Sequence, residues 1–512
     1  MTAVGYLLGI DVGTTGAKAL LVNEKGEIVA RSTHEYPLYT PRPGWAEQNP
    51  ADWWQATVNA IRDVASAPGI KASEIVGMGL SGQMHGSVFL DAKNEVIRPA
   101  ILWCDQRTAD QCDWITRTAG RDTVVAETCN PVLTGFTAPK IVWLRQNESD
   151  AYARVRKVLL PKDYIRFLLT GEFATEVSDA SGTSLLNIRK RRWSKKMLAA
   201  LEMPEDWLPT VFESPVPSAK ISKEASSLTG LAAGMPVVGG GGDQAAGAVG
   251  NGIVVSGVIS VTVGTSGVVF AGLDSPAMDE QLRTHTFCHA VPGKWHVMGV
   301  MLSAGGSLRW FRDAVASEEV ALAKRMGVDP YELITAQAAT VEPGCEGLIF
   351  LPYLTGERTP YPDPNARGVF FGLNLRSGRP QMARAILEGV AYGLRDSLEI
   401  IRGMGVKITQ VRASGGGARS GLWRQIQADV FNTELVTITV DEGPAFGVAL
   451  LAGVGAGIFK TVQEACEKTI RLKDRTQPTA ANVATYELFY RTYRSLYPAL
   501  KPLFADLAKA VR

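Results

Sequence analysis

The chain has 512 residues, of which 46% are hydrophobic and 20% are charged. Because a single hydrophobic core stops growing at roughly 250–300 residues, this length predicts at least two domains, and the apolar content argues against disorder. The formal net charge of +2 excludes a general electrostatic attraction for nucleic acid or for an anionic membrane surface.

Cysteine spacing and hydropathy bear on the cellular compartment. The six cysteines lack the spacing of a disulfide framework, and the first residues lack the charged-then-apolar pattern of a signal peptide. One uncharged stretch, from Gln244 to Leu273, is long enough to span a bilayer. Gly, Ser and Thr interrupt it, and its apolar residues are mainly Val and Ile, which favours buried strands joined by tight turns. We expect a cytoplasmic protein with reduced thiols and no membrane segment.

The first hundred residues alternate between strand and helix patterns. Residues 6–31 contain three short apolar runs separated by Gly-Thr-Thr-Gly and Asn-Glu-Lys-Gly turns, which predicts three strands. Helical periodicity follows at residues 50–64, and a further strand at 75–80 runs into Ser-Gly-Gln-Met-His-Gly. This alternation predicts an α/β architecture.

An internal repeat suggests two related halves. Val-Gly-Thr-Thr-Gly at residues 12–16 recurs as Val-Gly-Thr-Ser-Gly at residues 263–267, and each copy lies between two β-rich runs. A shared hairpin turn at this separation predicts two related domains and not a solenoid. The glycine-rich run at 239–242 and Asn251-Gly252 favour a boundary there, so we expect domains at 1–252 and 253–512, the second with a helical C-terminal tail.

The first hairpin has the composition of a phosphate-binding turn. The backbone N–H groups and hydroxyls of Gly13, Thr14 and Thr15 can surround phosphate oxygens. The carboxylate of Asp11 would repel phosphate, so an intervening Mg²⁺ with its waters is expected, and Lys18 adds positive charge. An ordinary hairpin is the competing interpretation.

The second hairpin, with Gly264, Thr265 and Ser266, has no acid at the position equivalent to Asp11. Two such hairpins facing one another would hold a nucleoside triphosphate from both sides.

A third glycine cluster, at residues 415–418, lies between a predicted strand at 408–411 and a predicted helix at 422–431. Exposed backbone at such a turn suits adenine or ribose, although the spacing is not that of a dinucleotide fingerprint. A tight helix-packing turn explains the cluster equally well.

Asp243 lies between the glycine run and an Ala/Gly-rich helix start. A helix-capping aspartate is one interpretation. The other is a general base that takes the proton from a substrate hydroxyl as it attacks a γ-phosphoryl group.

Two segments have side chains suited to a sugar. Met84 and His85 offer an apolar contact and a hydrogen bond, while Trp103 and Asp105 offer a ring face and an acceptor. All four residue types are also common in ordinary cores.

Four metal-binding side chains occur close together in the sequence, at His285, Cys288, His289 and His296. Their spacing fits no common zinc pattern, so we do not expect a structural zinc.

Two long segments identify a family resemblance. Residues 135–147 are similar to the first signature of the FGGY family of carbohydrate kinases, and residues 368–373 with 381–388 are similar to the second. The resemblance covers nearly the whole chain. Motifs at 81–86, 160–164, 178–183, 240–247 and 351–360 look like those of members that phosphorylate D-xylulose. Glycerol-specific members would have Arg-Glu where Met84-His85 stands.

The resemblance implies two ribonuclease-H-like domains, as in hexokinase, actin and chaperone ATPases, with ATP in the cleft between them. It implies phosphorylation of D-xylulose at O5 with ATP and Mg²⁺ in pentose catabolism, in a cytoplasmic homodimer with only small-molecule partners. Asp243 would be the base and a second metal contact, and Asp11 would hold Mg²⁺ through water. The residues expected at the sugar are Met84, His85, Trp103, Asp105, Asp243 and Gln244. Those expected at the nucleotide are Asp11, Gly13, Thr14, Thr15, Lys18, Gly264, Thr265, Ser266, Gly305, Gly306, Gly416, Gly417 and Ala418.

Three alternatives remain open. The substrate could be L-ribulose, D-ribulose or gluconate. An ATP-driven filament or chaperone would need a polymer interface or a peptide-binding domain, and only the remainder of a domain and a helical tail follow the second signature. A sugar sensor without catalysis is disfavoured because Asp11 and Asp243 are both present.

Overall fold

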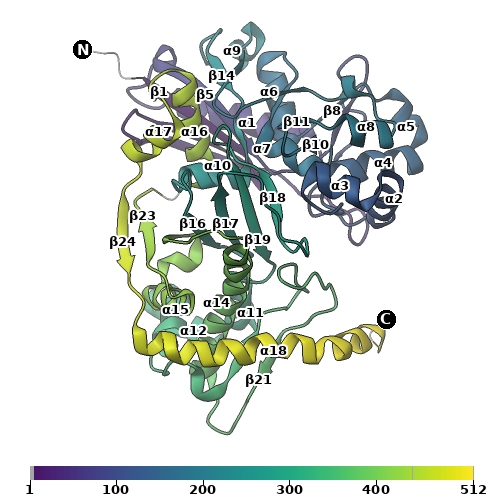
Figure 1. Cartoon of the computed structure of the whole chain (residues 1–512). Helices are drawn as coiled ribbons and strands as arrows, with labels where there is room; N and C mark the ends of the chain where they lie inside the picture. The colour runs from purple at the N-terminus through teal and green to yellow at the C-terminus, as the bar shows by residue number, and fades with distance from the viewer. Residues whose placement is uncertain (1–4, 441, 511–512) are drawn as a thin grey trace.

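The computed structural model describes residues 5–440 and 442–510. Its core is a pair of seven-stranded sheets, one in each lobe of Figure 1. In spatial order the first sheet contains β13 (Pro217–Lys220), β14 (Pro236–Val238), β5 (Ile75–Gly82), β1 (Tyr6–Val12), β2 (Gly16–Val22) and β3 (Ile28–Glu35), with β15 (Gly241–Gly242) beside β5. The second contains β18 (His285–Cys288), β19 (Trp295–Met301), β17 (Gly267–Leu273), β16 (Val258–Val263), β22 (Gln410–Ser414), β23 (Leu435–Ile438) and β24 (Leu472–Thr476). The predicted α/β class is confirmed.

Helices cover both sheets. Those of the first half are α1 (Pro50–Ala65), α2 (Ala109–Ala119), α3 (Arg121–Thr128), α4 (Thr137–Asn147), α5 (Ser149–Arg154), α6 (Pro161–Thr170), α7 (Val177–Ala180), α8 (Lys195–Ala200), α9 (Lys223–Thr229) and α10 (Asp243–Gly250). Those of the second half are α11 (Gly305–Ala314), α12 (Ser317–Met326), α13 (Pro330–Ala338), α14 (Arg379–Gly403), α15 (Gly421–Phe431), α16 (Gly443–Gly455), α17 (Val462–Thr469) and α18 (Ala480–Ala510). Within the described ranges, no helix is long and apolar enough to cross a membrane.

The repeated pentapeptide occupies equivalent places in the two sheets. It joins the antiparallel strands β1 and β2 in the first copy, and β16 and β17 in the second. In each copy the first strand also pairs in parallel with a strand from later in the chain, β5 or β22. The two sheets therefore share the same local arrangement around the turn.

Most of the predicted elements are confirmed. The three N-terminal strands are β1, β2 and β3, the helix at 50–64 is α1, and the strand at 75–80 is β5. The predicted strand and helix around the third glycine cluster are β22 and α15. The uncharged stretch at 244–273 contains the strands β16 and β17, as predicted, while its first residues form α10, in agreement with the predicted helix start after Asp243. Small residues there allow α10 and α16 to pack closely, since a Cβ on Gly447 would lie 1.8 Å from the carbonyl oxygen of Ala246.

Helix α16 crosses from the second half of the chain to the first sheet. It packs against β1 and β5, where Figure 1 shows it beside α17 in the upper lobe. A Cβ on Gly9 would lie 1.9 Å from the carbonyl oxygen of Ala445, and one on Gly79 would lie 2.3 Å from that of Val448. Residues 445–452 are all buried, as expected of a helix that is apolar on every face. The lobes are therefore joined by more than one crossing of the chain.

Candidate functional site

Three parallel strands of the first sheet end side by side. Asp11 on β1 is in register with Ser81 on β5, which in turn pairs with Gly241 on β15. Met84 and His85 follow the end of β5, and Asp243 follows the end of β15. Neighbouring strands lie about 4.8 Å apart, so the backbones of Asp11 and Gly241, two residues before Asp243, are roughly 10 Å apart. The fold thus gathers the predicted metal contact, base and sugar residues at one sheet edge.

The Asp11 carboxyl lies in a desolvated position. Burial raises its pKa to about 6, while the nearby hydroxyl of Ser81 and the charge of Lys18 act in the opposite direction. Its buried Oδ1 has no hydrogen-bond partner among the described residues. A buried carboxylate oxygen without a partner fits the water shell of a divalent cation.

Asp243 is the first residue of α10, and Gly242 takes the N-cap position before it. The carboxylate is therefore not the N-cap acceptor that one interpretation of the sequence supposed. Burial and the charge of Asp11 raise the pKa of Asp243 to about 7, while hydrogen bonds from Gln244 act in the opposite direction. A carboxyl group with a pKa near neutrality is suited to general-base catalysis.

Met84 lies near this base, and His85 is the next residue in the chain. A Cβ on Gly242 would approach Sδ and Cγ of Met84 to 3.0 Å, so the methionine packs directly beside the residue that precedes Asp243. His85 has a left-handed backbone (φ 69°), and its ring stacks on Phe136 at 4.7 Å between centroids.

The protonation of His85 follows from its surroundings. Its Nδ1 lies 2.8 Å from the carbonyl oxygen of Gly182. A carbonyl only accepts, so Nδ1 carries the proton. Burial lowers the pKa of the ring to about 3, and the imidazole is therefore neutral. Its Nε2 consequently presents a lone pair, which can accept a hydrogen bond from a hydroxyl group.

Trp103 and Asp105, the two other predicted sugar residues, differ in exposure and in hydrogen bonding. Trp103 is 41% exposed and donates its indole N–H to the hydroxyl of Thr14 at 3.0 Å. Asp105 is fully buried, and its carboxylate accepts from the N–H of Ala46 at 2.7 Å and from the guanidinium of Arg107 at 2.7–3.0 Å. The structure therefore gives Asp105 a role in holding the loop and does not support the predicted sugar contact.

The first hairpin presents free backbone donors. The N–H of Gly13 is used within the turn, on the carbonyl of Gly16 at 3.0 Å. By contrast, the N–H groups of Thr14 and Thr15 donate to no other residue in the described part of the chain. Lys18 forms an ion pair with Glu442, which lies just before α16. The predicted contact of Lys18 with phosphate would require exchange of this partner.

The second hairpin is built in the same way. The N–H of Gly264 donates to the carbonyl of Ser266 at 2.9 Å, and those of Thr265 and Ser266 have no acceptor within the described residues. Gly305 and Gly306 donate their N–H groups to the carbonyls of Gly264 (2.8 Å) and Thr265 (3.0 Å). These two glycines therefore hold the hairpin against α11 and have no free N–H for a phosphate.

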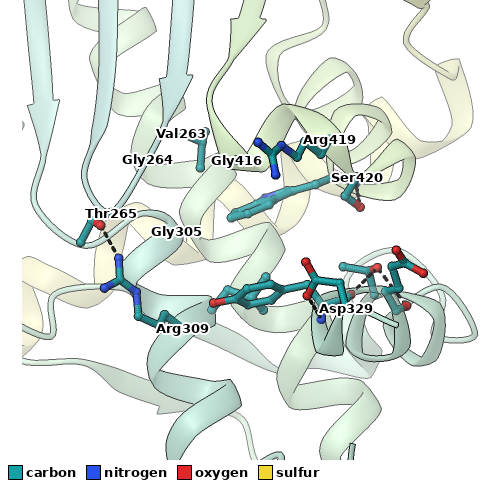
Figure 2. Close-up of a pocket in the computed structure, with 15 residues that line it drawn as sticks. Val263, Gly264, Thr265, Gly305, Arg309, Asp329, Gly416, Arg419 and Ser420 are labelled. Carbon is teal, nitrogen blue, oxygen red and sulfur yellow. Dashed lines mark hydrogen bonds between the residues drawn. The ribbon is translucent and has the colours of Figure 1, made fainter. Parts of the chain in front are cut away.

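A cavity of about 480 Å³ opens beside this hairpin (Figure 2). Five residues predicted at the nucleotide line it, namely Gly264, Thr265, Gly305, Gly416 and Gly417. Ala418 is the next residue along, and its carbonyl accepts from Arg424 at 2.7 Å. The volume is in the range of small-molecule and cofactor sites.

The sequence did not identify the polar walls of this cavity. Arg309, Asp329, Tyr331 and Arg419 line it, with Arg419 and Asp329 on opposite sides in Figure 2. Arg309 donates to the hydroxyl of Thr265. Its position four residues after Gly305, one helical turn into α11, is a signal that could have identified it.

The histidine-rich segment forms part of a buried aromatic cluster. The ring of His296 stacks on Phe270 at 4.3 Å, and Nε2 of His289 donates to the carbonyl of Ile253 at 2.9 Å. Across residues 5–440 and 442–510, no three His, Cys, Asp or Glu side chains are grouped so that they could hold a metal ion.

Comparison with known proteins places this geometry in a family. The N-terminal domain model of the FGGY family of carbohydrate kinases matches residues 6–250, and the C-terminal domain model matches residues 259–456. The chain is 41% identical to xylulose kinase of Escherichia coli K12 over 499 residues (97% of this chain, 100% of the relative). It is 38% identical to xylulose kinase of Bacillus subtilis 168 over 498 residues (97% and 98%) and 34% identical to gluconokinase of the same organism over 458 residues (88% of each).

Solved structures show the same fold as this chain. Xylulose kinase from Rhodospirillum rubrum superposes with a TM-score of 0.90 at 29% identity, covering 98% of this chain and 100% of that one. The predicted pair of similar α/β domains is thus the known two-domain fold of these kinases. The chain belongs to the FGGY family of carbohydrate kinases and is an ATP-dependent sugar kinase.

Proposed function

We propose that this kinase phosphorylates D-xylulose at O5, with Asp243 as the general base. The observation that carries the proposal is the carboxyl group of Asp243, with a pKa raised to about 7, at the sheet edge where Met84 packs against Gly242 and the next residue, His85, has a neutral imidazole. Relatives named xylulose kinase align over nearly the whole chain, which supports this choice of sugar.

Each residue of the site has a role in this scheme. Asp243 takes the proton of the terminal hydroxyl as its oxygen forms a bond to the γ-phosphorus, and the bond from that phosphorus to the leaving ADP breaks. Nε2 of His85 accepts a hydrogen bond from a sugar hydroxyl, and Met84 contacts the carbon chain. Placement of both reactants in reacting geometry supplies a further large share of the rate.

The two hairpins and the cavity hold the nucleotide in this proposal. The unused N–H groups of Thr14, Thr15, Thr265 and Ser266 suit phosphate oxygens. Adenosine would lie in the cavity beside Gly416 and Gly417. Mg²⁺ would be held by Asp11 through water, with Asp243 as a second contact, and would supply neutralisation of phosphate charge. The unpartnered Oδ1 of Asp11 fits this assignment.

We also propose the domain boundary near residue 252, a cytoplasmic location, a role in pentose catabolism and a homodimer. The first of these is supported by the interval between the family-model matches, which end at residue 250 and resume at 259. The others rest on the family resemblance.

A second candidate substrate is gluconate, since a gluconokinase is 34% identical to this chain. The test is sugar-dependent ADP release with Mg²⁺-ATP across D-xylulose, D-ribulose, L-ribulose, glycerol and gluconate. We expect strong and selective stimulation by D-xylulose. Stimulation by another sugar of this panel would support kinase activity and refute D-xylulose as the substrate. Stimulation by none of the five would favour a sensor, filament or chaperone.

A further inference from the structure

A cluster of buried charged residues lies beneath the glycine run that leads to Asp243. Helix α6 contributes Lys162 and Arg166, which are fully buried, and the segment around α7 contributes Glu176 and Asp179, also fully buried. Buried charges cost free energy unless each is paired and hydrogen-bonded. Among these groups, Glu176 contacts the glycine run directly.

Glu176 gathers five hydrogen-bond donors. Its carboxylate accepts from the N–H groups of Ser178 and Asp179 at 2.7 Å each, and from the hydroxyls of Ser178 and Ser214 at 2.9 Å each. The fifth donor is the N–H of Gly242, at 3.2 Å. The same N–H also donates to the hydroxyl of Ser178 at 3.0 Å. Gly242 is therefore held by two acceptors, themselves hydrogen-bonded to each other.

The other end of the glycine run is held by the guanidinium of Arg166. Arg166 donates to the carbonyls of Val238 and Gly239 at 2.5 Å and 2.7 Å. Lys162 lies 3.1 Å from the carboxylate of Asp179 and 3.8 Å from that of Glu176, so it links the charges of the cluster. Both ends of the run are thus tied to the same buried cluster.

The location of Gly242 gives these contacts a consequence for catalysis. It pairs with Gly82 at the end of β5, packs against Met84, and immediately precedes Asp243. Any shift of its backbone moves the carboxylate relative to a bound sugar. A misplacement of about 1 Å can cost roughly 10²-fold in rate.

We propose that Glu176 and Ser178 are positioning residues for the catalytic base: they fix the Gly242 amide and thereby the place of the Asp243 carboxylate. This inference rests on the proposed function, because it takes Asp243 as the base. It assigns a role to the 178–183 motif, whose part in the site was otherwise unexplained.

Two buried serines provide a matched test. Ser178 and Ser214 are both fully buried and both donate to Glu176, but only the hydroxyl of Ser178 contacts Gly242. We expect Ser178→Ala to lower kcat about tenfold, with the KM for sugar and for ATP changed less than about threefold. Ser214→Ala should show a similar change in Tm and a kcat within about twofold of wild type. Equal kcat values in the two variants would overturn the proposal.

Glu176→Gln provides the second test, with Glu388→Gln as its control. Glu388 is a buried carboxylate in α14 that accepts from Arg384 at 2.8 Å and from Tyr486 at 2.9 Å, far in sequence from the glycine run. Both variants should lose stability, but only Glu176→Gln should lose kcat, by about 10²-fold, with little change in KM. Retained kcat in folded Glu176→Gln would overturn the proposal. If that variant does not fold, the serine pair decides alone.

Asp243→Asn separates this inference from the function it rests on. If Asp243→Asn abolishes turnover while Ser178→Ala and Glu176→Gln turn over normally, the base assignment holds and the positioning role is wrong. If Asp243→Asn turns over normally, the base assignment itself is wrong.

Discussion

Trp103 donates its indole N–H to the hydroxyl of Thr14 at 3.0 Å, which ties the predicted sugar-side loop to the first phosphate hairpin. The Thr14 hydroxyl in turn donates to the side-chain oxygen of Gln83 at 3.3 Å. A hydroxyl has one proton, so Thr14 has none left to donate to a phosphate oxygen. Phosphate contacts from this hairpin would then come from backbone N–H groups and from the hydroxyl of Thr15. Gln83 and Trp103 thus position the turn that would hold phosphate.

Replacement of His85 tests the sugar site. His85→Ala removes the acceptor Nε2, so a sugar hydroxyl would lose its partner on binding, at a cost of about 1–3 kcal/mol. We expect the KM for sugar to rise about tenfold or more and the KM for ATP to change less than about threefold, as steady-state kinetics with each substrate varied will show. Equal increases in both constants would mean that the sugar does not bind at His85.

Replacement of Asp105 distinguishes a structural residue from a sugar ligand. Its carboxylate pairs with Arg107, whose side chain is also buried. Asp105→Asn breaks this pair and should lower the free energy of unfolding by roughly 3 kcal/mol, measured by chemical denaturation. The control is Asp274→Asn, which removes an exposed partner of Lys294 and should cost less than about 1 kcal/mol. Unchanged stability with a raised sugar KM would restore Asp105 as a sugar ligand.

Arg309 is predicted to contact the nucleotide. It lines the cavity and reaches Thr265, so its guanidinium lies where phosphate oxygens would approach the second hairpin. Arg309→Ala should raise the KM for ATP about tenfold and leave that for sugar nearly unchanged. Arg312→Ala is the control, because Arg312 lies on the same helix and pairs with Asp313. Similar ATP constants in the two variants would exclude the contact.

Local patterns in the sequence predict the hairpins and the strand ends well, since each strand, turn and helix there is encoded by adjacent residues. The hydrogen bond from Ala46 to Asp105 could not be predicted, because the two residues lie 59 positions apart in the chain. The buried cluster at Glu176 was missed for the same reason, since it joins α6, α7 and the glycine run. The position of α16 was also missed, although its entirely apolar sequence is a signal of a helix buried on all sides.

The raised pKa of Asp243 predicts a pH-dependent effect on stability. Its value in the folded protein, about 7, exceeds the ordinary 3.8, so the folded state binds this proton more tightly than the unfolded chain does. The stability contributed by the protonated carboxyl is present at low pH and is lost as the pH rises through 7. Asp243→Asn has no carboxyl group at this position, so its stability does not fall for this reason as the pH rises. Its Tm should therefore exceed that of wild type by a few degrees at pH 8 and by less at pH 5.

The comparison at two pH values contains its own control. The buried acids Glu357 and Asp396, whose pKa values are also raised, are present in both proteins, and their titration cancels in the difference. Asp11 does not cancel in this way, because its charge acts on Asp243. An equal difference in Tm at pH 5 and pH 8 would show that Asp243 does not titrate in this range.

The most direct test of the central claim is D-xylulose-dependent ADP release by wild type and Asp243→Asn under saturating Mg²⁺-ATP and sugar. General-base catalysis contributes roughly 10²- to 10⁴-fold, so we expect folded Asp243→Asn to lose at least 10²-fold in kcat. A folded variant with the kcat of wild type would contradict the assignment of Asp243 as the base.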